Sequence, residues 1–208
     1  ETRDMFVIYR PFILNEPFVD KRMVDVVEYI KQDSTAVVEF NTNGHPMTPK
    51  ISDSMIELDV DLIRFSIDGY YKETFNEARG ISYDKVYENV KYFLNEVDRL
   101  GKDIKTEIRM IKLPNTEKEQ VKFKEYWERY NPSDIIFTDL YKYPWEGQEK
   151  SIEKPCLKII DEMFFYVDGR ATLCCWDTNE RQIVGDVKTE SVMEIWESEI
   201  MKECRNLL

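Results

Sequence analysis

The first 140 residues alternate short apolar segments with longer amphipathic ones, and this alternation constrains the fold most strongly. Segments of strand type are expected at residues 5–9, 35–40, 62–67, 104–113 and 135–140. Between them, apolar side chains recur at helical spacing in residues 20–32, 49–58, 71–78, 83–100 and 116–130. Strands that alternate with helices in this way form right-handed βαβ units, so we predict an α/β fold with a parallel sheet. Five strands suit either an open sheet or part of a barrel.

Single residues predict where several of these helices begin and end. Thr48 can cap the helix at residues 49–58, and Pro49 suits its first turn. Gly101 stands where the helix at residues 83–100 should end. Asn115 or Thr116 can cap the helix at residues 116–130. Residues 141–155 are polar and contain Pro and Gly. We therefore predict two domains, at residues 1–150 and 151–208.

Polar residues gather where the predicted strands end. In parallel α/β sheets, ligands bind at the carboxyl ends of the strands. The candidate cofactor-binding residues are Asn15, Glu16, Pro17, Asn43, Ser66, Asp68, Arg79, Arg109 and Leu140. Among them are a carboxylate for an ammonium group, guanidinium groups for a carboxylate, and side chains suited to hydroxyl groups. Turn formation or surface charge also explains each residue alone, but their collection at one edge indicates a site for a zwitterionic, ribose-bearing ligand.

A cysteine hairpin organises the rest of the chain. Cys156 is followed by twelve residues, then by Gly169, four more residues, and the pair Cys174 and Cys175. Residues 163–167 indicate an aromatic strand, Asp168 and Gly169 a tight turn, and residues 171–173 the return strand. This hairpin would bring Cys174 close to Cys156, and two thiolates make half of a metal or cluster site. Packing in a core and a disulfide are the alternatives. A short strand at residues 184–187 and a helix at residues 191–207 follow.

Composition limits the classes of function. A hydrophobic content of 42% supports a real core, and a net charge of −12 argues against a nucleic-acid surface. No apolar run is long enough for a membrane span and no signal peptide is evident, so we expect a cytoplasmic protein without membrane contact. The single histidine, His45, lacks any accompanying hydrolase motif, and no glycine-rich phosphate loop occurs.

The order of these motifs resembles the radical S-adenosylmethionine (radical SAM) enzymes that carry a C-terminal SPASM or shorter twitch domain. The resemblance covers essentially the whole chain and includes the segments NEP, NTNG, SIDG, VGDV and SVMEIWES. Its most specific part is the spacing Cys156-x12-Gly169-x4-Cys174. That spacing is followed by Gly185-Asp186-Val187 and then by Glu194-Ile195-Trp196.

The resemblance implies a partial (β/α)6 barrel that binds S-adenosylmethionine at its strand ends, with a small C-terminal hairpin-and-helix domain. Asn15-Glu16-Pro17 matches the Gly-Gly-Glu-Pro motif that holds the methionine amino group, although Leu14 and Asn15 replace the glycines. Ser66 and Asp68 match contacts to the ribose or to the methionine carboxylate, and Arg79 matches an arginine that meets that carboxylate. The metal candidates, for an auxiliary iron–sulfur cluster, are Cys156 and Cys174, with Cys175 and Cys204 as weaker ones.

Two parts of the family pattern are missing. The Cys-x3-Cys-x2-Cys motif that binds the catalytic [4Fe–4S] cluster is absent, because no cysteine precedes Cys156. The later cysteines that complete an auxiliary cluster are absent too. We therefore expect a chain that lacks the first barrel strand and both ends of a complete enzyme, with the ligands of the catalytic cluster outside it.

Three functions are compatible with the sequence. The resemblance favours a radical SAM oxidoreductase or maturase, in which the complete protein reductively cleaves S-adenosylmethionine to a 5′-deoxyadenosyl radical. That radical would abstract hydrogen from a peptide or small-molecule substrate, and a flavodoxin or ferredoxin would donate electrons. The alternatives are a non-catalytic, cluster-free binding or scaffold protein and a zinc-binding α/β protein that uses the four cysteines.

Overall fold

The computed structural model describes residues 8–140 and 156–207, which belong to two compact units. Among the described residues, the larger unit comprises 8–12 and 16–140, and the smaller unit comprises 13–15 and 156–207. The domain boundary predicted near residue 150 lies outside the described residues. Within the described residues, no helix is long and apolar enough to cross a membrane.

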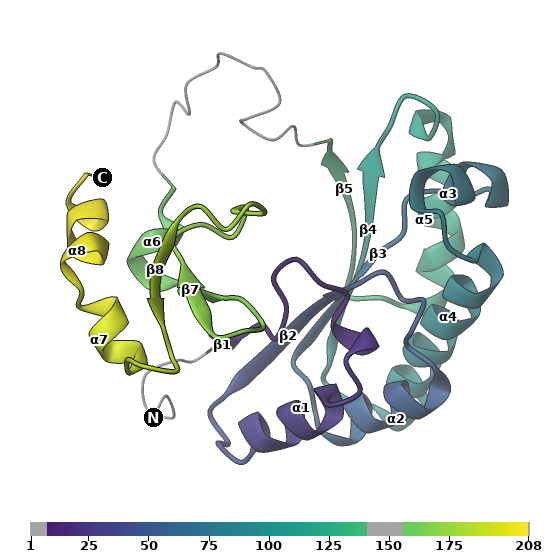
Figure 1. The fold of residues 1–208 in the computed structure, drawn as a ribbon. Helices are drawn as coiled ribbons and strands as arrows, with labels where there is room; N and C mark the ends of the chain where they lie inside the picture. The colour runs from purple at the N-terminus through teal and green to yellow at the C-terminus, as the bar shows by residue number, and fades with distance from the viewer. Residues whose placement is uncertain (1–7, 141–155, 208) are drawn as a thin grey trace. The chain divides into compact units, whose positions relative to one another are not determined.

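A five-stranded parallel sheet forms the centre of the larger unit (Figure 1). Each strand pairs with the next one along the chain, in parallel, so the spatial order equals the sequence order. The strands are β1 (Ile8–Tyr9), β2 (Val37–Thr42), β3 (Leu62–Ser66), β4 (Lys105–Lys112) and β5 (Asp134–Asp139). The predicted α/β fold with a parallel sheet is confirmed, and residues 5–7 of the first predicted strand lie outside the described residues.

Five α-helices connect these strands. They are α1 (Met23–Lys31), α2 (Pro49–Glu57), α3 (Lys72–Arg79), α4 (Tyr83–Leu100) and α5 (Gln120–Trp127). Gly101 ends α4 in the left-handed conformation, as predicted, with φ at 62°. Pro49 occupies the first turn of α2, also as predicted, but the Thr48 side chain makes no capping hydrogen bond there.

The prediction of one continuous helix at residues 116–130 is wrong. Two 3-10 turns, η2 (Glu117–Glu119) and η3 (Glu128–Tyr130), stand on either side of α5. Thr116 does not cap a helix, because its buried hydroxyl instead accepts a hydrogen bond from the Leu113 N–H at 3.0 Å. A third 3-10 turn, η1 (Pro17–Val19), precedes α1.

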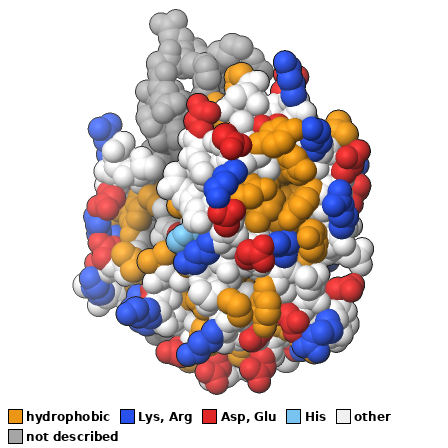
Figure 2. Space-filling model, turned by 90° about the vertical axis from the view of Figure 1, so that its right-hand side faces the viewer, with side chains coloured by type: hydrophobic (Ala, Val, Ile, Leu, Met, Phe, Trp, Pro, Cys, Tyr) orange, Lys and Arg blue, Asp and Glu red, His pale blue; other side chains and the backbone are white. Residues whose placement is uncertain are grey.

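The hydrophobic core of this unit lies between one face of the sheet and the helices. Strand residues of that face are fully buried, among them Phe40, Ile63, Phe65, Ile108 and Met110. They pack with apolar side chains of all five helices, and Figure 1 shows α2 to α5 along this side of the sheet. Figure 2 views the outer side of these helices, where hydrophobic patches lie between charges of both signs.

The smaller unit is built on a three-stranded antiparallel sheet of β6 (Phe164–Phe165), β7 (Arg170–Thr172) and β8 (Ile183–Asp186). The predicted hairpin is present, and Gly169 takes a positive φ of 96° in its turn. A short helix that the sequence did not predict, α6 (Lys158–Asp161), separates Cys156 from β6.

The single helix predicted at residues 191–207 is two helices, α7 (Val192–Trp196) and α8 (Glu199–Asn206). Each has its own serine cap, because Ser191 accepts from the Glu194 N–H and Ser198 from the Met201 N–H. A Cβ at Gly185 would lie 2.6 Å from Ile195 Cγ1, so the glycine allows α7 to approach β8. This approach buries Ile195 completely.

Candidate functional site

Glu16 is fixed at the carboxyl end of β2. Its Oε1 accepts a hydrogen bond from the Thr42 hydroxyl at 2.6 Å, and its Oε2 accepts one from the Asn43 N–H at 2.7 Å. The Thr42 hydroxyl also accepts from the Gly44 N–H at 3.0 Å, and Gly44 has a positive φ of 75°. A carboxylate oxygen has room for more than one hydrogen bond, so Glu16 could still receive an ammonium group.

The neighbouring candidates mainly shape the local backbone. The Asn43 side chain accepts a hydrogen bond from the His45 N–H at 2.8 Å. Asn15 is exposed and accepts from the Ile13 N–H at 3.1 Å, whereas Pro17 is buried at the start of η1. Any contact of these three side chains with a cofactor stays a prediction.

Asp68 and Arg79 form an ion pair, with Nη2 and Oδ2 2.6 Å apart. Asp68 is 5% exposed, and its other oxygen accepts from the Ile111 N–H at 2.7 Å. This carboxylate therefore ties the loop after β3 to both α3 and β4. The Nε of Arg79 is buried and has no hydrogen-bond partner in the structure. That unused donor is available to an anionic ligand group.

Ser66 and Arg109 are direct neighbours at the carboxyl ends of β3 and β4. The Ser66 hydroxyl makes no hydrogen bond to any described residue, whereas Arg109 is held by Glu107, with Nη2 and Oε2 2.6 Å apart. Leu140 follows β5 directly and is half exposed. The structure thus brings Glu16 together with Asn43, Asp68 with Arg79, and Ser66 with Arg109.

From a row of charged side chains on the sheet face opposite the core, sequence reasoning singled out only Arg109. We call this row the charged strip, and its members are Arg10, Glu39, Arg64, Glu107 and Arg109. Glu39 Oε2 lies 2.8 Å from Arg10 Nε and 3.0 Å from Arg64 Nη1. Glu107 Oε2 lies 3.2 Å from Arg64 Nε and 2.6 Å from Arg109 Nη2. The strip therefore runs from the end of β1 to β4.

The alternation of side chains along the strands could have revealed the charged strip. Glu39, Arg64 and Glu107 occupy positions between the apolar residues that enter the core, as the period of two requires. Burial would raise the pKa of Glu39, but the hydrogen bonds from Arg10 and Arg64 hold it below its ordinary value. Both carboxylates of the strip thus lie between guanidinium groups.

All four cysteines of the chain line one cavity in the smaller unit. This cysteine cavity has a volume of about 270 Å³. Its remaining lining is mostly apolar and consists of Lys158, Ile159, Phe164, Leu173, Gln182 and Leu207. Cys156 is exposed, and Cys174, Cys175 and Cys204 are partly buried. Cys156 and Cys174, which the hairpin was predicted to bring close together, thus line the same cavity.

Asp177 organises the loop that carries Cys174 and Cys175. Its Oδ2 accepts from the Gln182 N–H at 2.7 Å and from the Thr172 hydroxyl at 3.2 Å, and its Oδ1 accepts from the Arg181 N–H at 3.0 Å. Burial would raise the pKa of Asp177, but these hydrogen bonds hold it below its ordinary value. Asp177 is therefore an ionised group that holds the cysteine loop in place, a role that the sequence did not predict.

The thiols of the cysteine cavity suit a soft metal or a cluster in chemical type, because thiolates are the ligands of zinc and of iron–sulfur clusters. Burial raises the pKa of the Cys175 thiol, and the nearby Lys158 ammonium only partly opposes this effect. Among residues 8–140 and 156–207, no three His, Cys, Asp or Glu side chains are grouped closely enough to hold a metal ion. Binding would require the thiols to turn further toward one another.

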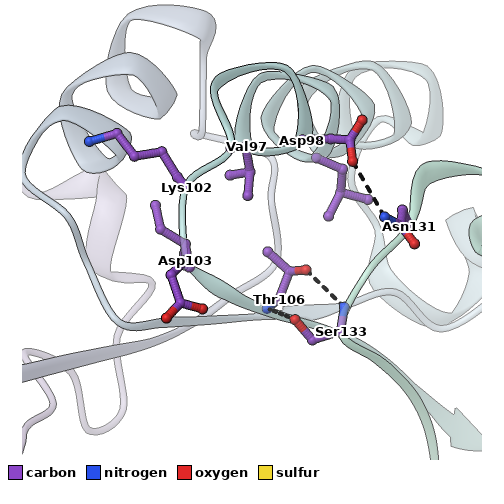
Figure 3. Close-up of a pocket in the computed structure, with 10 residues that line it drawn as sticks. Val97, Asp98, Lys102, Asp103, Thr106, Asn131 and Ser133 are labelled. Carbon is purple, nitrogen blue, oxygen red and sulfur yellow. Dashed lines mark hydrogen bonds between the residues drawn. The ribbon is translucent and has the colours of Figure 1, made fainter.

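A larger hollow, of about 400 Å³, lies at the amino ends of β4 and β5, beside the end of α4 (Figure 3). Its polar groups largely pair with one another. Asn131 donates to Asp98 at 3.3 Å, and Thr106 and Ser133 exchange two hydrogen bonds of 3.0 and 3.1 Å. Because it is at the opposite edge from the candidate residues, we assign no chemistry to it.

Comparison with solved structures identifies the class of fold. The structure of anSMEcpe with bound AdoMet is 14% identical, with a TM-score of 0.66, and the match covers 91% of this chain and 66% of that one. SuiB from Streptococcus suis is 10% identical, with a TM-score of 0.68 and coverages of 90% and 54%. BtrN in complex with AdoMet and 2-DOIA is 15% identical, with a TM-score of 0.57 and coverages of 97% and 66%. These proteins are radical SAM enzymes, and the parallel sheet of this chain has the fold of their partial barrel.

The C-terminal segment adds a second identification. Residues 156–207 match the SPASM family, described as an iron–sulfur cluster-binding domain. The predicted resemblance to radical SAM proteins with a SPASM domain is thereby confirmed. The chain spans 66% of the length of anSMEcpe and 54% of that of SuiB. No curated protein gave a significant sequence match.

Proposed function

We propose that the complete protein is a radical SAM enzyme that acts on a peptide or small-molecule substrate and receives electrons from a flavodoxin or ferredoxin. S-Adenosylmethionine and a reduced [4Fe–4S] cluster would supply a 5′-deoxyadenosyl radical, which abstracts hydrogen. This chain contributes the cofactor edge of the sheet and the SPASM domain, and the ligands of the catalytic cluster are not among its residues.

The cysteine cavity carries this proposal. A cavity lined by every cysteine of the chain, within the segment that matches an iron–sulfur domain, fits an auxiliary cluster in its donor set. Cys156 and Cys174 would hold the cluster on two sides of the hairpin. Its apolar lining would shield the cluster from water.

The carboxyl edge of the sheet would bind S-adenosylmethionine. Glu16 is fixed in place by Thr42 and Asn43 and would receive the ammonium group. The buried, unpartnered Nε of Arg79 and the free hydroxyl of Ser66 would meet the carboxylate or the ribose. Exchange of Glu16 for Gln should weaken binding of S-adenosylmethionine about tenfold by calorimetry. The exposed Glu28 of α1 provides the matched control, because Glu28→Gln should leave this affinity unchanged.

Anaerobic reconstitution with iron and sulfide tests the cluster. The chain should take up both, with visible charge-transfer absorbance, and a Cys156→Ala/Cys174→Ala variant should lose them. A Cys175→Ala/Cys204→Ala variant removes the other two thiols of the same cavity and provides the comparison. If neither variant loses iron, the cluster assignment is wrong.

Zinc binding is the second candidate, because four thiols around one cavity also suit a tetrahedral zinc site. Uptake of zinc and refusal of iron and sulfide under the same anaerobic conditions would favour it. The proposal of a radical enzyme would then lose its main support.

A further inference from the structure

The charged strip carries more positive than negative charge, although the chain as a whole has a net charge of −12. Three arginines share two glutamates, and each glutamate uses the same oxygen, Oε2, for both of its arginine neighbours. The other charged residues of these strands on this face, Lys105 and Asp134, are exposed and opposite in sign.

Several hydrogen-bonding groups of this face have no partner within the described residues. Arg64 uses Nη1 for Glu39, and its buried Nε lies near Glu107 without hydrogen-bond alignment. Arg109 binds Glu107 through Nε and Nη2, which leaves its Nη1 unused. Asn41, the register neighbour of Arg64, has a buried Oδ1 without a partner. A guanidinium has five N–H donors, so the strip has donors to spare.

The position of the strip suits a ligand. Its side chains are held between one-tenth and about one-third exposed, so they are partly shielded but still reachable. The helices of this unit pack on the other face of the sheet. Arg109 at one end of the strip is the register neighbour of Ser66 at the proposed cofactor edge. A group bound along the strip would thus lie beside that edge.

We propose that the charged strip binds a carboxylate of the substrate, with Arg64 and Arg109 as its donors. This inference rests on the proposed function, because it names the chemical class of the substrate. Guanidinium groups pair with carboxylates through parallel hydrogen bonds, and such charge-assisted bonds are strong where water is partly excluded. The acid is either a small molecule or an acidic side chain of a peptide.

Calorimetry on the full chain with succinate as the probe tests the proposal. Arg109→Gln should weaken succinate binding about tenfold, because it removes one charge-assisted contact. Glu107→Gln should strengthen binding several-fold, because it removes a competing carboxylate while the amide oxygen can still accept from Arg64. A strip that only stabilises the fold would give weaker binding, or none, in both variants. Arg99→Gln on α4, where Arg99 pairs with Glu96, is the matched control and should have no effect.

A second arm separates the two sources of the carboxylate. The peptides acetyl-Gly-Glu-Gly-amide and acetyl-Gly-Gln-Gly-amide differ only in the acid. Preference for the glutamyl peptide over both its amide and succinate indicates a peptide substrate. Preference for succinate indicates a small carboxylic acid. Circular dichroism and thermal unfolding of each variant show whether the fold is kept.

Competition separates this inference from the proposed function. S-Adenosylhomocysteine has the same carboxylate as the cofactor, so saturation with it occupies the cofactor site. Succinate should still bind with the same response to the two substitutions. Displacement of succinate would overturn the inference, since the carboxylate would then be that of the cofactor. If the chain binds succinate as described but not S-adenosylhomocysteine, cofactor binding fails and the carboxylate site stands.

Discussion

The two faces of the five-stranded sheet use alternate residues of the same strands for different purposes. On one face, Phe40, Ile63, Phe65 and Ile108 are fully buried under the helices. On the other, Glu39, Arg64, Glu107 and Arg109 pair with one another at 2.6 to 3.2 Å. A strand's period of two makes this division possible, because neighbouring residues point to opposite sides. The first face specifies the fold, and the second presents charged groups.

This difference between the two faces indicates which property of the protein each face controls. Apolar burial is non-directional and sums over many contacts, so the core face depends on volume and shape. The charged strip depends on a few directed contacts between ionised groups. We therefore expect the stability of the unit to be dominated by the first face and the recognition of ligands by the second.

The largest expected effect is on the core face. Phe65→Ala should lower the free energy of unfolding by about 3–5 kcal/mol, because it leaves a cavity in a close-packed core. Phe65 is fully buried and stacks edge-on against Phe93 at 5.6 Å. Urea denaturation followed by circular dichroism measures this loss. A loss below about 1 kcal/mol would mean that this face is not packed as described.

An intermediate effect is expected in the middle of the charged strip. Arg64→Met keeps an unbranched stem but removes contacts to both Glu39 and Glu107, and it should cost about 1–3 kcal/mol. Denaturation in low and high salt should show similar losses, since pairs that are mostly buried are only weakly screened. The exposed pair of Arg99 and Glu96 provides the control, and Arg99→Met should change the free energy of unfolding by no more than about 0.5 kcal/mol. Equal losses for the two substitutions would remove the distinction between the strip and the ordinary surface.

The core face could be predicted from sequence, whereas for the strip only the alternation along each strand was readable and the pairing between strands was not. The β-branched and aromatic residues of runs such as residues 62–67 predict strands. The spacing of apolar residues predicts the helices. Continuity was harder to judge. Two predicted helices are broken: 3-10 turns flank α5, and Ser198 caps a second C-terminal helix. The cap of Ser198 is a local side-chain hydrogen bond, which competes with a continuous helix but leaves the apolar pattern intact.

The candidate site was predictable where the order of elements along the chain determines which residues lie close together. Parallel strands place Glu16, Asn43 and Ser66 at one edge, and the hairpin places Cys174 on the cavity that Cys156 also lines. Pairing across strands was not predictable, because it depends on register. Glu39 meets Arg64 and Arg64 meets Glu107 only because β2, β3 and β4 align as they do. For the same reason, nothing in the sequence showed that Asp68 is engaged by Arg79 and Ile111.

The smallest expected effect concerns the pH dependence of the strip. The pKa of Glu39 is held below its ordinary value of 4.5, so its ionised form stabilises the folded state above that pH. This stabilisation is lost as the pH falls through the lowered pKa of the folded protein. Glu39→Gln should therefore be less stable than the parent chain at pH 7, and the difference in urea midpoint should shrink as the pH falls below 4.5. Phe65→Ala removes no ionisable group. The difference in urea midpoint between Phe65→Ala and the parent chain should therefore not change with the ionisation of Glu39 over the same pH range. A constant difference for Glu39→Gln would show that its contacts act through packing, and the two faces would then be stabilised in the same way.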